Sequence, residues 1–296
     1  MADEKKYKNL KMANFYYFFR KTYNKIILFL IFLLSLLAVL PFFYIAYFVF
    51  KKGFSAINWN FFTKLPAGPG AMEAGLANGI LGSLIMVGLA CLIGLPWGCF
   101  LGVFLSEYRF HPLSKLLRFV IDLSISTPSI VLGIFVYSLL VSFFGFSAYA
   151  GALALMLILI PIVGKSTEEI LKMVPNHIRE AGLALGLPRW KVILQILIPG
   201  TFTMLFSGVI LSIARVAGET APLLFTSLGN QFFSNSLSEP TASLPVQIYE
   251  FSKSGFPDLE AMAWGGAFLL ISFVFFINFS VRLLIFIKSA NYKNDI

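Results

Sequence analysis

The segment IILFLIFLLSLLAVLPFFYIAYFVF, residues 26–50, is an uninterrupted apolar run without a charged side chain. A helix of this length rises about 37 Å, which is enough to cross the hydrocarbon core of a bilayer. Basic residues precede it, as in a signal peptide, but the run exceeds a signal h-region and lacks a small-residue cleavage pattern. We therefore predict a retained transmembrane helix.

Composition extends this prediction to the whole chain. Hydrophobic residues make up 58% and charged residues 12% of the 296 positions, which excludes an ordinary soluble domain with about 45–50% apolar residues. The sequence predicts an all-α integral membrane protein with six transmembrane helices. Residues 1–25 form a basic segment, 26–50 the first helix, 76–287 the main transmembrane domain with a loop at 165–195, and 288–296 a tail. The five later spans are expected at Leu76–Leu105, Phe119–Phe144, Phe146–Gly164, Ile196–Thr226 and Ala261–Ile287.

The distribution of positive charge predicts the orientation. The net charge of +9 gathers in short loops between apolar spans, which is typical of membrane anchoring and not of a nucleic-acid partner. With both termini cytoplasmic, the inner segments hold eighteen Lys and Arg residues and the outer segments four. We expect a multi-pass protein of the bacterial cytoplasmic (inner) membrane. Its acidic outer loop, residues 227–260, is suited to meet an extracytoplasmic partner.

The loop at residues 165–195 contains more recognisable motifs than any other segment outside the predicted membrane. Its GKST at residues 164–167 lacks the leading glycine and the strand of a phosphate-binding loop, so we expect no nucleotide site. Asn176 is suited to cap a short helix, Gly186 to end it in a left-handed turn, and Pro188 to start the next helix. An amphipathic helix this short needs a partner groove for its apolar face.

The same loop resembles the EAA loop of ABC importer permeases. The match consists of Glu180, Ala181, Gly182 and Gly186, followed by Ile196, Ile198 and Pro199. Gly182 replaces the second alanine of the pattern and Ile198 replaces its leucine, and both keep the residue type. The resemblance implies that residues 180–186 couple to an ATPase subunit. It places ATP and Mg on that partner, so that this chain binds no cofactor of its own.

Other segments narrow the resemblance to PstA-type permeases of phosphate ABC importers. They are GETAPLLFT at 218–226, PSIVLGIF at 128–135, LPWGCFLGVFLSEY at 95–108 and LPVQIYEF at 244–251. This resemblance implies a type I, MetI-like permease that works as a heterodimer with a PstC-type permease. The further implied partners are a PstB-type ATPase dimer and a PstS-type external phosphate-binding protein.

The fifth predicted span contains two charges, Arg215 and Glu219. A charge at the bilayer centre costs about 2.5–3.5 kcal/mol on insertion scales, so these residues are expected to face a protein interior or a wet cavity. At helical spacing they share a face with Gly208, Ser212 and Pro222. The third predicted span carries a second stripe, at Asp122, Ser126, Ser129, Gly133 and Tyr137. We expect the substrate path to be lined by Arg215, Glu219, Asp122, Ser126, Thr127, Ser129 and Thr220.

Three alternatives stay open at this point. Arg215 and Glu219 are also compatible with an ion pair that only helps assembly, although this order gives little support to a helix. The cargo of an EAA-loop permease is equally compatible with another oxyanion or a small nutrient. The third alternative is an ion-driven secondary transporter. The chain shows no motif of a membrane enzyme, and its histidines and cysteines have no spacing for a metal site or a disulfide.

Overall fold

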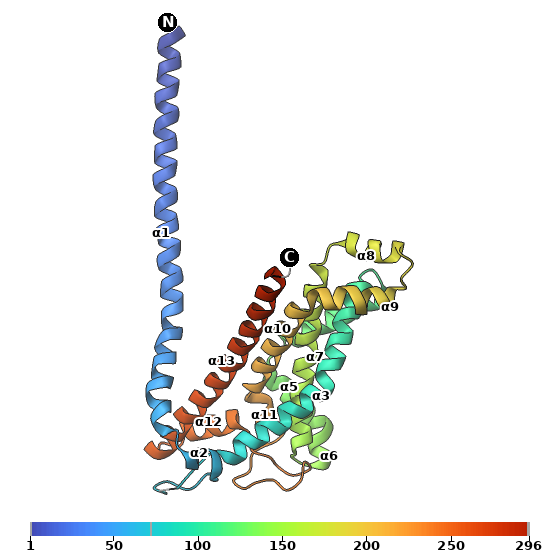
Figure 1. The fold of residues 1–296 in the computed structure, drawn as a ribbon. Helices are drawn as coiled ribbons and strands as arrows, with labels where there is room; N and C mark the ends of the chain where they lie inside the picture. The colour runs from blue at the N-terminus through green and yellow to red at the C-terminus, as the bar shows by residue number, and fades with distance from the viewer. Residues whose placement is uncertain (1, 72, 295–296) are drawn as a thin grey trace. The chain divides into compact units, whose positions relative to one another are not determined.

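In the computed structural model, the backbone of residues 2–71 and 73–294 is described, with the side chains of residues 16–71, 73–280 and 282–283. Every regular element in that part of the chain is helical (Figure 1). The elements are α1 (Ala2–Ala56), α2 (Trp59–Thr63), α3 (Ala77–Glu107), α4 (Pro112–Ser126), α5 (Ser129–Val136), the π-helix η1 (Tyr137–Val141), α6 (Ser142–Phe144), α7 (Ala148–Lys172), α8 (Asn176–Ala184), α9 (Arg189–Lys191), the π-helix η2 (Val192–Leu197), α10 (Ile198–Ala217), α11 (Ala221–Leu224), α12 (Leu244–Ser252) and α13 (Pro257–Asn294).

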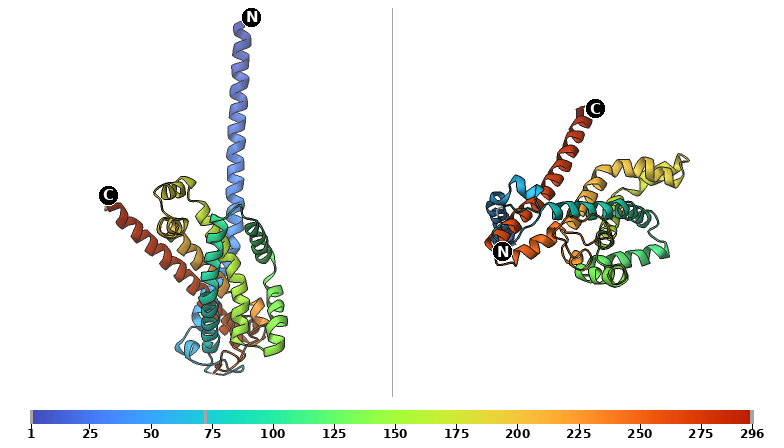
Figure 2. Two further views of the ribbon diagram at one scale, coloured as in Figure 1. Left: turned by 90° about the vertical axis from the view of Figure 1, so that its right-hand side faces the viewer. Right: turned by 90° about the horizontal axis from the view of Figure 1, so that it is seen from below.

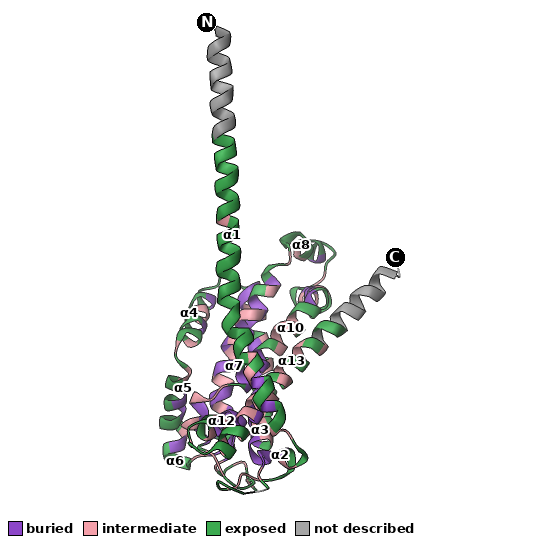
Figure 3. Ribbon diagram, turned by 90° about the vertical axis from the view of Figure 1, so that its left-hand side faces the viewer, coloured by how far each residue is buried: buried purple, intermediate pink, exposed green. Residues whose placement is uncertain are grey.

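Helix α1 extends beyond both ends of the predicted first span. Residues 1–51 and 52–296 form two separate compact units, so α1 is described by itself. Its apolar side chains are exposed along most of the described length (Figure 3). A helix that is apolar on every side is stable only where lipid or another protein surrounds it. This exposure therefore agrees with a membrane-spanning role.

The second unit is built around α3 and α7, which pack along each other. Successive glycines at i, i+4 spacing on α3 permit the close approach. A Cβ at Gly98 would lie 2.8 Å from Cβ of Val163, and one at Gly102 would clash with Cβ of Thr167. Buried residues concentrate on α7, as Figure 3 shows. This glycine series therefore serves helix packing.

Five described helices are long and apolar enough to cross a membrane, and the number rises to six if one bent pair counts as a span. That pair corresponds to the predicted third span, so the expectation of one continuous helix there is wrong. Helix α4 ends at Ser126 and α5 begins at Ser129, with a bend of 104° between α4 and the helical segment 129–144. Thr127 adopts extended backbone (ψ 131°), because the residue before a proline disfavours the helical region.

The predicted fifth span also breaks before its expected end at Thr226. Helix α10 ends at Ala217, Gly218 and Glu219 are non-helical, and the short α11 follows. The stripe that was expected to continue from Arg215 to Glu219 and Pro222 on one helix therefore does not exist. The two further views in Figure 2 agree with Figure 1 that α8 lies at one end of the α3 and α7 pair and α11 toward the other.

Candidate functional site at the broken span

A cavity of about 310 Å³ lies at the break between α4 and α5. Its walls come from three parts of the chain: the break itself, α7, and the segment where α10 ends. Proline at the break leaves backbone groups without helical partners, and such backbone is tolerated at membrane depth only beside protein or water. The lining residues are Ser124, Ile125, Ser126, Thr127, Pro128, Ser129, Leu132, Ile158, Ile162, Arg215 and Glu219.

The cavity therefore brings together five of the seven residues expected on the path: Ser126, Thr127, Ser129, Arg215 and Glu219. The remaining lining residues on α4, α5 and α7 were not singled out from the sequence. Ser124 lies two residues before Ser126, and Ile158 and Ile162 lie one helical turn apart on α7. Only the tertiary contact between α7 and the break identifies them as part of the wall.

Arg215 sits on the last turn of α10, and its side chain is exposed in the isolated chain. No carboxylate lies within the 4.0 Å ion-pair distance of its guanidinium in the described part of the chain, and no hydrogen bond from it is recorded there. Glu219 is half-buried and lines the same cavity without pairing with Arg215. Among the described residues, Arg215 thus has no acidic partner that would neutralise it, as the alternative of an assembly ion pair requires.

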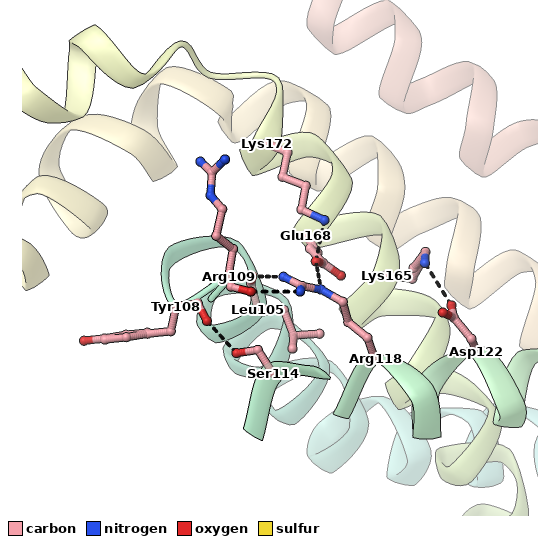
Figure 4. Close-up of polar contacts among 9 residues, drawn as sticks. All are labelled: Leu105, Tyr108, Arg109, Ser114, Arg118, Asp122, Lys165, Glu168 and Lys172. Carbon is pink, nitrogen blue, oxygen red and sulfur yellow. Dashed lines mark hydrogen bonds and ion pairs between the residues drawn. The ribbon is translucent and has the colours of Figure 1, made fainter. Parts of the chain in front are cut away.

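Two expected path residues lie elsewhere. Asp122 accepts a hydrogen bond from Nζ of Lys165 on α7, at 2.8 Å (Figure 4). Thr220 precedes α11, where its carbonyl accepts hydrogen bonds from the amides of Leu223 and Leu224. Neither residue lines the cavity. Asp122 lies one helical turn before Ser126 on α4, and Thr220 lies past the end of α10.

Beyond the cavity, the two expected stripes meet in direct packing. A Cβ at Gly133 on α5 would lie 2.6 Å from Cα of Pro222 on α11. The close contact holds α5 against the segment that follows Glu219. At this level the interior between the stripes is filled by protein, so the cavity does not continue as an open channel between Gly133 and Pro222.

The residues of the EAA-like loop form the compact turn around α8. Asn176 was expected as the cap, but it is the first residue of α8, and its Oδ1 accepts a hydrogen bond from Nη2 of Arg109 at 3.1 Å. Gly186 has φ +78°, which confirms the predicted left-handed turn. Gly182 is buried, and a Cβ there would lie 3.0 Å from side-chain atoms of Val192 and Ile196. Because a methyl group would be crowded here, this contact favours glycine at a position where the family pattern has alanine.

The outward side of α8 carries apolar surface. Leu185 is 82% exposed and Ile178 is 37% exposed, whereas Gly182 faces η2. Glu180 and Ala181 are exposed on the same short helix. An apolar surface on a nine-residue helix outside the spans is suited to contact another protein.

Comparisons with known proteins agree with this architecture. The family described as "Binding-protein-dependent transport system inner membrane component" matches residues 94–286. The phosphate transport system permease protein PstA of Haemophilus influenzae is 42% identical over 272 residues, covering 91% of this chain and 96% of that protein. PstA of Xylella fastidiosa (strain Temecula1) is 44% identical over 238 residues, covering 79% and 83%. PstA 1 of Mycobacterium tuberculosis (strain H37Rv) is 34% identical over 262 residues, covering 85% and 84%.

Solved structures share the fold at lower identity. The MetNI methionine ABC transporter in an inward-facing conformation aligns with a TM-score of 0.58 and 18% identity, covering 71% of this chain and 94% of that chain. A bacterial alginate ABC transporter, in complex with an alginate-bound periplasmic protein, aligns with a TM-score of 0.58 and 14% identity, covering 87% and 94%. The predicted all-α, MetI-like permease architecture is confirmed. The chain belongs to the family of binding-protein-dependent transport system inner membrane components, and within it to the PstA-type permeases of phosphate ABC transporters.

Proposed function

We propose that this chain is one of two permease halves of an ATP-driven importer of inorganic phosphate, and that phosphate passes the cavity at the broken span. The observation that carries the proposal is the guanidinium of Arg215 on the cavity wall, which has no ion-pair partner among the described residues. A guanidinium offers a planar fork of donors that matches phosphate oxygens, and it stays protonated at any physiological pH. An oxyanion is therefore attracted to this point.

The remaining cavity groups favour passage over tight binding. Helix α5 begins in the wall at Ser129, and the partial positive charge of a helix N-terminus favours an anion. The hydroxyls of Ser126 and Thr127 already donate to backbone carbonyls at 2.7 Å, so their protons are engaged. Glu219 adds a negative charge to the same wall. Opposed charges suit a site that attracts an anion weakly enough to release it.

The partners in this proposal follow the family. A PstC-type permease completes the path, a PstB-type ATPase dimer binds ATP and Mg, and a PstS-type external protein delivers phosphate. We assign ATPase coupling to residues 176–186, including Glu180, Ala181, Gly182 and Gly186, because α8 presents exposed apolar surface next to a rigid glycine turn. The distribution of Lys and Arg supports a cytoplasmic location of α8 and both termini at the bacterial inner membrane.

Reconstitution of the four-component complex in proteoliposomes tests the proposal. Arg215→Gln should lower uptake of radiolabelled phosphate by about tenfold or more, since a hydrogen bond to a charged group contributes about 1.5–3 kcal/mol, and should leave assembly intact. Arg282→Gln on α13 is a matched control, because Arg282 does not line the cavity. Unchanged uptake by Arg215→Gln in an assembled complex would exclude Arg215 from the path.

The same preparation separates the alternatives for cargo and energy source. Competition by unlabelled sulfate as strong as that by unlabelled phosphate would support a different oxyanion as the cargo. Uptake that persists without the ATPase and follows an imposed ion gradient would support a secondary transporter. Phosphate-dependent acceleration of ATP hydrolysis, which requires the external binding protein, is the result we expect.

A further inference from the structure

A single arginine side chain on α8 bonds to the ends of two long helices. Arg179 lies in the middle of α8, and its side chain is 12% exposed. Nη1 and Nη2 donate to the carbonyl oxygens of Val174 and Leu171 at 2.6 and 2.7 Å, at the end of α7. Nε donates to Oε1 of Glu107 at 3.0 Å, at the end of α3. The guanidinium thus bonds two carbonyls at one helix end and pairs with a carboxylate on another helix.

A second arginine, Arg118 in the middle of α4, connects that helix to α3 and α7, as Figure 4 shows. Nη2 of Arg118 donates at 2.7 Å to the carbonyl oxygen of Leu105, in the last turn of α3, and Nη1 donates at 3.1 Å to that of Arg109, just past the end of α3. Nε donates at 2.6 Å to Oε1 of Glu168 on α7, a carboxylate that is 1% exposed. Nζ of Lys172 approaches the same oxygen at 2.6 Å.

The two arginines together join four helices at one end of the unit. Arg179 links α8 to the ends of α7 and α3, and Arg118 links α4 to α3 and α7. Each guanidinium holds three oxygens with fixed geometry, which resists rotation better than a point charge does. The chain between α7 and α8 is only residues 173–175, so Arg179 leaves α8 little freedom to move alone.

Helix α4 carries the connection to the cavity. It runs from Pro112 to Ser126 and ends at the 104° break, and its last residues Ser124, Ile125 and Ser126 are cavity wall. A helix of 15 residues spans about 22 Å and moves as a rigid element. A displacement of α3 and α7 at the α8 end therefore shifts the wall opposite Arg215.

We infer that Arg118 and Arg179 are positioning residues that transmit movement of α8 to the cavity through α3, α7 and α4. The inference rests on the proposed function, because it requires an ATPase that acts on α8. Neither arginine lines the cavity. Their loss should separate ATP hydrolysis from transport without removing the surface that binds the ATPase.

The test measures phosphate transported per ATP hydrolysed in the reconstituted four-component complex. Arg179→Gln and Arg118→Gln should each leave the ATPase bound and hydrolysing, with the transport ratio lowered about tenfold, the change expected for one lost charge-assisted contact. The matched controls are Arg189→Gln and Lys115→Gln, exposed cations for which no hydrogen bond or ion pair is recorded among the described residues. Both controls should keep the wild-type ratio.

A double-mutant cycle distinguishes transmission from general damage. Glu107→Gln should lower the ratio less than Arg179→Gln, and the double variant should resemble Arg179→Gln alone, because both changes break the same connection. Wild-type ratios in the assembled Arg179→Gln and Arg118→Gln complexes would overturn the inference. Loss of ATPase binding by both Arg179→Gln and Glu107→Gln would also overturn it, since the arginine would then serve folding. A wild-type complex without phosphate-stimulated hydrolysis would instead refute the proposed function.

Discussion

Replacement of Glu168 by glutamine removes one charge from a buried contact and preserves the shape of the side chain. Oε1 of Glu168 accepts hydrogen bonds from Nε of Arg118 and Nζ of Lys172, each at 2.6 Å. The carboxylate is 1% exposed, whereas the two cationic side chains are 25% and 43% exposed. We therefore expect Glu168→Gln to lower the free energy of unfolding mainly by removing the buried negative charge of the carboxylate. The two cations add less to the loss, because water still reaches both of them.

The burial of the partners sets the magnitude. Loss of one partner from a fully buried ion pair costs about 3–5 kcal/mol. Arg118 keeps its hydrogen bonds to two carbonyls, and the partly exposed Lys172 can be hydrated. The expected loss is therefore smaller, about 2–3 kcal/mol. Glu169 is the matched control, because it is exposed and has no recorded ion pair among the described residues, so Glu169→Gln should change stability by about 0.5 kcal/mol or less.

The measurement is the thermal unfolding midpoint of the purified chain in detergent. A loss of about 2–3 kcal/mol corresponds to a decrease of about 4–10 °C for a chain of this size. Glu169→Gln should lower the midpoint by no more than about 2 °C on the same scale. Equal shifts for the two variants, or no shift for Glu168→Gln, would show that the contact between α4 and α7 does not depend on the buried charge.

Three further predictions concern other parts of the chain. Gly102→Val should prevent the close approach of α3 and α7 and reduce the yield of folded protein in size-exclusion chromatography, whereas Gly88→Val should have little effect because its Cβ meets no atom within 4 Å. Gly186→Val forces a β-branched residue to φ +78°, a strain of about 1–3 kcal/mol. In a pull-down assay this variant should fail to retain the ATPase, whereas the wild-type chain should retain it. Burial raises the pKa of Glu250 above 4.5. Ionisation of this carboxyl therefore disfavours the folded state as pH rises through the raised pKa, and Glu250→Gln should abolish a small fall in the unfolding midpoint as pH rises above 4.5; an unchanged pH profile in that variant would contradict the assignment.

Local backbone geometry was the most predictable part of the structure. Gly186 takes positive φ and Pro188 directly precedes a helix, because these conformations depend on the residue itself. Asn176 shows the limit of such reasoning. Its amide has the chemistry of a cap, but Pro175 precedes the helix and Arg109 engages the Asn176 side chain.

The path residues were only partly predictable. Arg215 and Glu219 stood out because charges are rare in apolar runs, and both line the cavity. Asp122 belonged to the expected stripe, yet it pairs with Lys165, 43 residues away in the sequence. Arg118 and Arg179 gave no signal beyond ordinary basic residues near span ends. Their partners, Glu168 and Glu107, are selected by how α3, α4, α7 and α8 pack.

The sequence by itself determined that this chain is a helical membrane protein. Without water in the bilayer core, an apolar run of sufficient length satisfies its backbone only as a helix, and this holds whatever its neighbours are. Tertiary structure decided where two of the expected helices break. Pro128 and Gly218 permit a break, but the 104° bend exists where α5 packs through Gly133 onto Pro222. That contact joins residues 89 positions apart, so no local pattern encodes it.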